Sequence, residues 1–236
     1  MINNEKILRM IMMTYTISLK LEPATYQQFL NIHQKLNASD REPQAKILGE
    51  NLSKIACEVI HQAFGQLVKN GSSKDQDSAK VLTQIQDAIM KYMPWSVSFF
   101  GNDRLLPMVN HVRTLIYEQN GQHYISYPVE KSLIHDLLDS AEQMRQGNKQ
   151  FVSSGLKSFT KVVDQGVTSL IREPKKLLKF NLVVDKTLNG VISLTTQLGY
   201  KRFENLSKNH DPESIVAYFD HFMVFLDSEG QKKAKL

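Results

Sequence analysis

Cysteine is almost absent from this sequence of 236 residues, in which Cys57 is the single one. One cysteine excludes an intrachain disulfide, and it excludes any metal site that needs several thiolates. Cys57 falls within an apolar helical segment, which favours an inert core thiol over a reactive one. The low cysteine content indicates a reducing compartment, so we predict a cytoplasmic protein.

Long apolar runs are missing as well. The longest charge-free stretch in the second half covers residues 187–200, and asparagine, glycine, threonine and glutamine interrupt it. This stretch is too short and too polar to cross a bilayer. The apolar run at residues 10–13 is followed by no small-residue cleavage site, so we predict neither export nor a membrane span.

The common catalytic signatures are absent too: the sequence has no glycine-rich phosphate loop, dinucleotide fingerprint, H-E-x-x-H pair or nucleophile elbow. His135 and Asp139 have helical spacing with Asp136 beside them, but a metal site needs a further ligand from elsewhere. Asp220 and His221 favour a polar pair on a helix more than an acid–base dyad. We therefore predict no catalytic residue, no metal and no cofactor, with an enzyme of unrecognised type as an alternative.

Positive charge is concentrated in the second half of the chain. Residues 144–208 contain twelve lysines and arginines and four acidic residues, so this region carries +8 and the rest of the chain −3. Such an imbalance favours an anionic partner, whether an acidic protein, nucleic acid or a membrane surface. Four of the cations have helical spacing and predict one cationic face for an anion or an acidic partner: Arg172, Lys175, Lys176 and Lys179. A merely solvated face is the alternative.

Proline, glycine and apolar spacing divide the chain into helices and short strands. The alternation from Tyr15 to Leu21 predicts a half-buried strand. Helices are predicted at residues 23–36, 43–68, 81–93, 105–117, 128–146, 174–199 and 212–226, and two more short strands at 95–100 and 123–127. Gly147, Gly155 and Gly166 predict breaks or kinks after the fifth helix. The predicted fold class is mainly α, a multi-helix bundle of about six or seven helices with two or three short strands.

The predicted organisation is a single mainly helical domain over residues 1–236. The change of charge near residue 147 gives an alternative subdivision into a mixed N-terminal part, 14–146, and a basic helical part, 147–227. The polar residues 228–236 predict a frayed tail.

Residues 14–68 resemble the ribbon-helix-helix repressors. The resemblance rests on the strand sequence TYTISLKL at 14–21, the helical sequence PATYQQFL at 23–30, and a second helix after it. In that family, strands from two subunits pair and enter the major groove of DNA. The resemblance implies base reading by Thr16, Ser18 and Lys20.

The second half of the chain resembles the phasins, because its helices are cationic and amphipathic, with few acidic and many small residues. This resemblance implies helices that lie on a granule or membrane surface.

The favoured interpretation is a non-enzymatic interaction protein, an adaptor or chaperone-like subunit that binds a protein partner, with DNA as a less favoured partner. The last predicted helix is apolar around most of its surface, which predicts deep burial or a partner. Its predicted partner contacts are four side chains: Phe219, Phe222, Met223 and Leu226. Burial inside the bundle is the alternative explanation for them.

Overall fold

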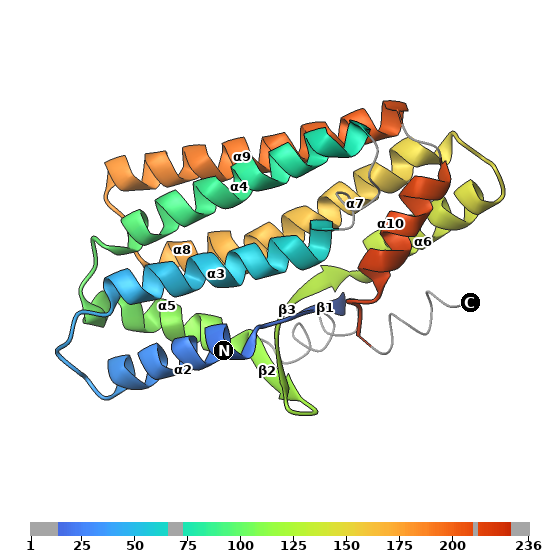
Figure 1. Cartoon of the computed structure of the whole chain (residues 1–236). Coiled ribbons are helices and arrows are strands. Elements are labelled where there is room, and N and C mark those ends of the chain that lie inside the picture. The colour runs from blue at the N-terminus through green and yellow to red at the C-terminus, as the bar shows by residue number, and fades with distance from the viewer. Residues whose placement is uncertain (1–13, 66–72, 210–211, 228–236) are drawn as a thin grey trace, which may run out of the picture. The chain divides into compact units, whose positions relative to one another are not determined.

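The computed structural model describes residues 14–65, 73–209 and 212–227 (Figure 1). The elements in chain order are β1 (Thr14–Lys20), α2 (Pro23–Asn37), α3 (Ala45–Phe64), α4 (Ser73–Val97), α5 (Asn102–Thr114), β2 (Ile116–Gln119), β3 (Gln122–Glu130), α6 (Lys131–Arg145), α7 (Phe151–Val167), the π-helical segment η2 (Thr168–Arg172), α8 (Glu173–Leu177), α9 (Leu182–Asn209) and α10 (Pro212–Met223). Helices predominate and a small three-stranded antiparallel sheet accompanies them, which confirms the predicted mainly α class. Within the described ranges, no helix combines the length and the apolar character that a membrane crossing requires.

The chain divides into two compact units. The first unit comprises residues 1–18, 126–169 and 201–236, and the second comprises residues 19–125 and 170–200. The division falls within β1 and within β3, so both strands pass from one unit into the other. Residue 147, where the charge of the sequence changes, lies inside the first unit, and the predicted tail at 228–236 lies outside the described residues.

The helical core of the first unit forms where α6 packs against α7 and α10. The ring of Phe159 on α7 is fully buried and has ring contacts with three aromatic side chains of α10: Tyr218, Phe219 and Phe222. A Cβ atom at Gly155 would lie 2.9 Å from the Phe219 ring, and one at Gly166 would lie 2.8 Å from the Tyr127 ring. The predicted kinks at these glycines are wrong, because α7 runs unbroken through both and uses their small size for close packing.

In the second unit, α3 packs against α2 and α4, and α5 packs against α2 and α8. Gly49 allows α3 to approach α4 closely, since a Cβ atom there would lie 2.6 Å from the Cα atom of Pro94. The fully buried Asn51 donates its amide to the Thr25 carbonyl at 2.9 Å, which ties α3 to α2. The helix predicted from residue 43 thus has neighbours on two sides.

The sheet has the strand order β1-β3-β2. β2 and β3 form an antiparallel hairpin with Gln119 opposite Gln122, and the two turn residues Asn120 and Gly121 both have positive φ, 52° and 73°. Two consecutive left-handed residues are typical of a type I′ turn, for which Asn-Gly is the preferred sequence. The predicted strands at 123–127 and 15–21 are both confirmed.

Two proline-based boundaries and one long helix differ from the prediction. Pro94 lies inside α4, so residues 95–97 are helical and the predicted strand at 95–100 is wrong. Pro128 lies inside β3 and does not start a helix; the pairing of β3 with β2 ends at Ile125, so no hydrogen bond from β2 requires an N–H at position 128. The helix predicted at 174–199 is interrupted, because α8 ends at Leu177 and α9 begins at Leu182.

Candidate partner-binding surfaces

The four apolar residues predicted to contact a partner lie in the core of the chain itself. Phe219 and Phe222 are 1% exposed, Leu226 is 2% and Met223 is 5% exposed. Phe219 and Phe222 pack on Phe159 of α7, and Leu226 forms a bridge with Ile17 of β1. The broad apolar surface of α10 therefore reflects burial within the first unit, and these four side chains do not form a partner surface.

The four predicted cations do not share one helical face. Arg172 ends the π-helical segment, and Lys175 and Lys176 lie on the short helix α8. Lys179 follows the end of that helix and has a left-handed backbone with φ of 47°. Lys175 is paired with Asp185 at 2.5 Å and bonds Asn189, and its side chain is 13% exposed, so it faces inward. The prediction of a single stripe is wrong because α8 ends too early for the helical spacing to reach Lys179.

The connection between α8 and α9 is held by Arg104 of α5. The Arg104 guanidinium donates hydrogen bonds to the carbonyl oxygens of Leu178 at 2.8 Å and Lys179 at 2.7 Å. It also lies over the Phe100 ring, with its carbon 4.5 Å from the ring centroid. The Phe100 ring in turn lies 4.8 Å from the Phe180 ring. These contacts fix the α8–α9 connection against the start of α5.

Asn181 completes this connection by capping α9. Its side-chain oxygen accepts a hydrogen bond from the Val184 N–H at 3.0 Å, and its carbonyl accepts one from Asp185 at 2.9 Å. Asparagine is a favoured N-cap residue for this reason. In this connection the carbonyls of Leu178, Lys179 and Asn181 and the Val184 N–H therefore bond inside the protein.

Apolar and cationic side chains project from this turn. Leu182 is 71% exposed and Val183 is 73% exposed, and Leu177 is also exposed. Lys179 and Lys186 are exposed beside them, and neither forms an ion pair with any residue that the structure describes. We call this set the α8–α9 tip: Leu177, Lys179, Leu182, Val183 and Lys186.

A second apolar surface lies at the end of α4. Tyr92 and Trp95 lie on α4 and Phe99 lies in the turn that follows it, and we call these three residues the aromatic row. The Tyr92 and Trp95 rings are 6.3 Å apart and the Trp95 and Phe99 rings 5.2 Å apart, both edge to face. Trp95 is 37% exposed and Phe99 is 52% exposed. Lys91 flanks the row, with its ammonium 5.2 Å from the centre of the Tyr92 ring.

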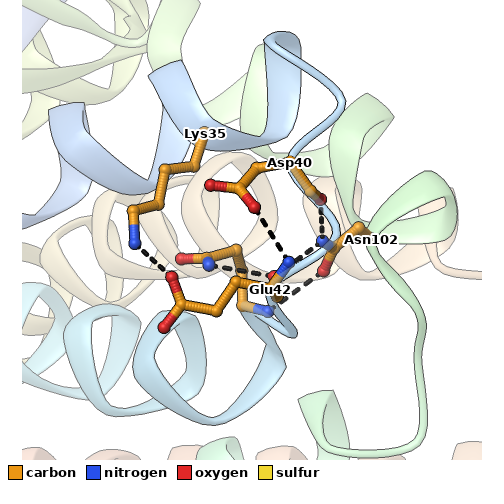
Figure 2. Close-up of polar contacts among 5 residues, drawn as sticks. Lys35, Asp40, Glu42 and Asn102 are labelled. Carbon is orange, nitrogen blue, oxygen red and sulfur yellow. Dashed lines mark hydrogen bonds and ion pairs between the residues drawn. The ribbon is translucent and has the colours of Figure 1, made fainter.

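A polar cluster between the α2–α3 loop and α5 is structural (Figure 2). The Asn102 amide donates hydrogen bonds to the carbonyls of Asp40 at 2.8 Å and Glu42 at 2.9 Å, and its oxygen accepts one from the Gln44 N–H at 3.0 Å. The Asp40 carboxylate accepts a hydrogen bond from the Glu42 N–H, and Lys35 pairs with Glu42. These groups are satisfied by one another, and together they fix the loop to the start of α5.

Two of the titratable groups singled out by the sequence have partners within the chain. His135 lies 3.3 Å from the Tyr15 hydroxyl, and Asp220 pairs with Arg145 at 2.5 Å. Among the described residues, no group of three or more histidine, cysteine, aspartate or glutamate side chains is arranged to hold a metal ion. Cys57 is half-buried, and burial raises the pKa of its thiol, with Glu58 and Asp87 adding to the effect.

The strand that resembles the ribbon-helix-helix repressors is bonded to this chain along both edges. One edge of β1 faces β3 in the sheet. On the other edge, the Ser18 N–H donates to the Phe225 carbonyl, and the Asp227 N–H donates to the Thr16 carbonyl, both at 2.8 Å. The edge that the repressor family uses to pair with a second subunit is thus occupied by residues 225–227.

Comparison with protein families, with characterised proteins and with solved structures gives no match to this chain. The candidate surfaces therefore rest on the geometry of the chain alone. Sequence reasoning missed the aromatic row, because it placed residues 95–100 in a strand. The spacing of Tyr92, Trp95 and Phe99 by three and four residues is the signal that could have found it.

Proposed function

We propose that this chain is a non-enzymatic interaction protein, an adaptor or chaperone-like subunit, and that it binds a partner protein through the aromatic row. The observation that carries the proposal is the exposure of two aromatic rings in contact, Trp95 on α4 and Phe99 in the turn that follows it. The chain has one tryptophan, and it lies at the surface, where its burial by a partner would be favourable.

Aromatic side chains are enriched at the centres of protein interfaces, where tryptophan and tyrosine dominate the binding energy. Scattered exposed apolar residues are ordinary, but adjacent ones form a patch that a partner can cover. Lys91 at the edge of the row suits an acidic group on the partner. For the compartment we keep the cytoplasm as our proposal, on the low cysteine content of the chain.

The test is quantitative copurification of the tagged full-length chain from the organism that makes it. Trp95→Ala and Phe99→Ala are compared with Leu194→Ala, which removes an exposed leucine of α9. We expect at least one partner protein to fall about tenfold or more with each aromatic variant and to stay unchanged with the control. Melting curves show whether each variant is folded.

Binding of the purified partner is then checked directly by fluorescence. Because Trp95 is the single tryptophan, it is the source of this chain's tryptophan emission, and the partner's own emission is subtracted. We expect a blue shift on binding, since burial removes the indole from water. A set of copurifying proteins that is the same for all three variants would overturn the proposal.

A further inference from the structure

We propose that the α8–α9 tip binds the surface of a lipid bilayer that contains anionic headgroups, with the chain held as a peripheral protein. This second binding activity goes beyond the proposed partner binding through α4. Three independent features of the tip carry it: exposed aliphatic side chains, a turn with internally bonded backbone groups, and unpaired cations.

The aliphatic side chains come first. Leu182 and Val183, in the first turn of α9, are more exposed than any other large apolar side chains described. Leu177 at the end of α8 is exposed on the other side of the same short connection. Leucine and valine carry no polar group for specific recognition, and a lipid surface accepts them without one.

The backbone of the turn suits contact with lipid. An unsatisfied carbonyl or N–H is costly where water is excluded. Arg104 occupies the carbonyls of Leu178 and Lys179, and Asn181 caps the Val184 N–H. The polar backbone groups that a turn normally leaves to water are therefore bonded inside the protein at these positions.

The charge of the tip is complementary to an anionic surface. Residues 172–186 contain five cationic and two acidic side chains, a net charge of +3. Both acidic side chains are neutralised by ion pairs, Glu173 with Lys176 and Asp185 with Lys175. Lys179 and Lys186 remain available, and a lysine stem can lie along an apolar surface while its ammonium reaches a headgroup.

Sedimentation of the full-length chain with vesicles tests the inference. One vesicle is phosphatidylcholine alone, and the other also contains phosphatidylserine. We expect binding to the second only, and a loss of binding as the salt concentration rises. The double variant Lys179→Glu/Lys186→Glu and the double variant Leu182→Asn/Val183→Asn should each lower the bound fraction about tenfold.

Matched controls make the result specific to the tip. Lys157→Glu/Lys161→Glu makes the same change of charge at two exposed lysines of α7, and Leu194→Asn makes the same apolar-to-polar change elsewhere on α9. Both should bind as the unaltered chain does. Failure of the unaltered chain to bind anionic vesicles would overturn the inference, as would equal losses in the controls. Binding of soluble polyglutamate in place of vesicles, lost with the Lys179/Lys186 variant, would overturn it in favour of an acidic protein.

Discussion

Arg104 holds the α8–α9 connection in place, and no local pattern in the sequence predicts this contact. It lies on α5, yet it bonds two carbonyls more than seventy residues later in the chain. The prediction of a cationic face rests on helical spacing, and this spacing no longer applies beyond Leu177, where α8 ends. A long-range contact of this kind has no signature in composition or periodicity.

Replacement of Arg104 by methionine should loosen the α8–α9 connection. The variant keeps most of the apolar stem and loses both hydrogen bonds and the contact with the Phe100 ring. We expect the free energy of unfolding to fall by about 1–2 kcal/mol, less than for a buried charged donor because the Arg104 side chain is exposed. Urea denaturation measures the change.

The control for this experiment is Arg41→Met. Arg41 is also exposed, and no hydrogen bond or ion pair of its side chain occurs within the described part of the chain. Its replacement should change stability by less than about 0.5 kcal/mol. Equal stability of the two variants would contradict the role given to Arg104.

Two glycines of α7 give a second prediction at the scale of single residues. Alanine normally stabilises a helix relative to glycine, by about 1 kcal/mol. At Gly155 the added Cβ would lie 3.0 Å from Ser140 and closer still to the Phe219 ring, and at Gly166 it would meet the Tyr127 ring. We therefore expect Gly155→Ala and Gly166→Ala to destabilise the protein by about 1–3 kcal/mol.

Gly190 in α9 provides the opposite case, because a Cβ atom there meets nothing within 4 Å. Gly190→Ala should stabilise the protein by about 0.5–1 kcal/mol. Thermal or chemical denaturation of the three variants measures the sign directly. If all three alanines stabilise, the close packing of α7 is not as described.

At the scale of helices and strands, the sequence correctly predicts the features that a residue's own backbone geometry determines. Pro23 starts α2 and Asn120-Gly121 makes the hairpin turn, since both depend on backbone geometry that the residue itself sets. The boundaries predicted at Pro94 and Pro128 are wrong, because whether a helix or a strand tolerates an internal proline depends on the elements next to it. Gly49 on another helix makes room for Pro94, and β2 begins only at Ile116, opposite Ile125, so that strand offers Pro128 no bonding partner.

The hairpin turn is itself open to test. Gly121 has φ of 73°, a region that disfavours residues with a Cβ atom, and a Cβ there would meet no other atom. Gly121→Ala should therefore cost about 1–2 kcal/mol through backbone strain alone. Gly101→Ala, in a loop with negative φ and open space around it, should cost much less. Chemical denaturation compares them, and equal costs would exclude backbone strain as the cause.

At the scale of the whole molecule, the organisation was beyond sequence reasoning. The first unit is assembled from three separate stretches of chain, and Ile17 pairs with Leu226 across almost the whole sequence. Periodicity reports which face of an element is buried, but it does not report against which element. For that reason the sequence predicts a partner contact for the apolar face of α10, which belongs to the core of the first unit.

Two buried tyrosines in that core should make the protein sensitive to alkaline pH. Burial raises the pKa of Tyr127 far above its ordinary value, and burial together with the neighbouring Tyr127 raises the pKa of Tyr218. Both hydroxyls then stay protonated in the folded protein at a pH where they ionise in the unfolded chain. The unfolded state binds fewer protons above about pH 10, so stability is complete below that pH and falls as pH rises through it.

Each such tyrosine lowers the free energy of unfolding by about 1.4 kcal/mol per pH unit above pH 10. The double variant Tyr127→Phe/Tyr218→Phe removes both ionisations, so its melting temperature should fall less steeply between about pH 9.5 and 11.5. Tyr117→Phe, at an exposed position of β2, should keep the slope of the unaltered chain. Only the slopes are compared, because the loss of buried hydroxyls also shifts stability at neutral pH. Equal slopes for all three proteins would mean that these hydroxyls ionise in the folded state, and that the core around α10 admits water.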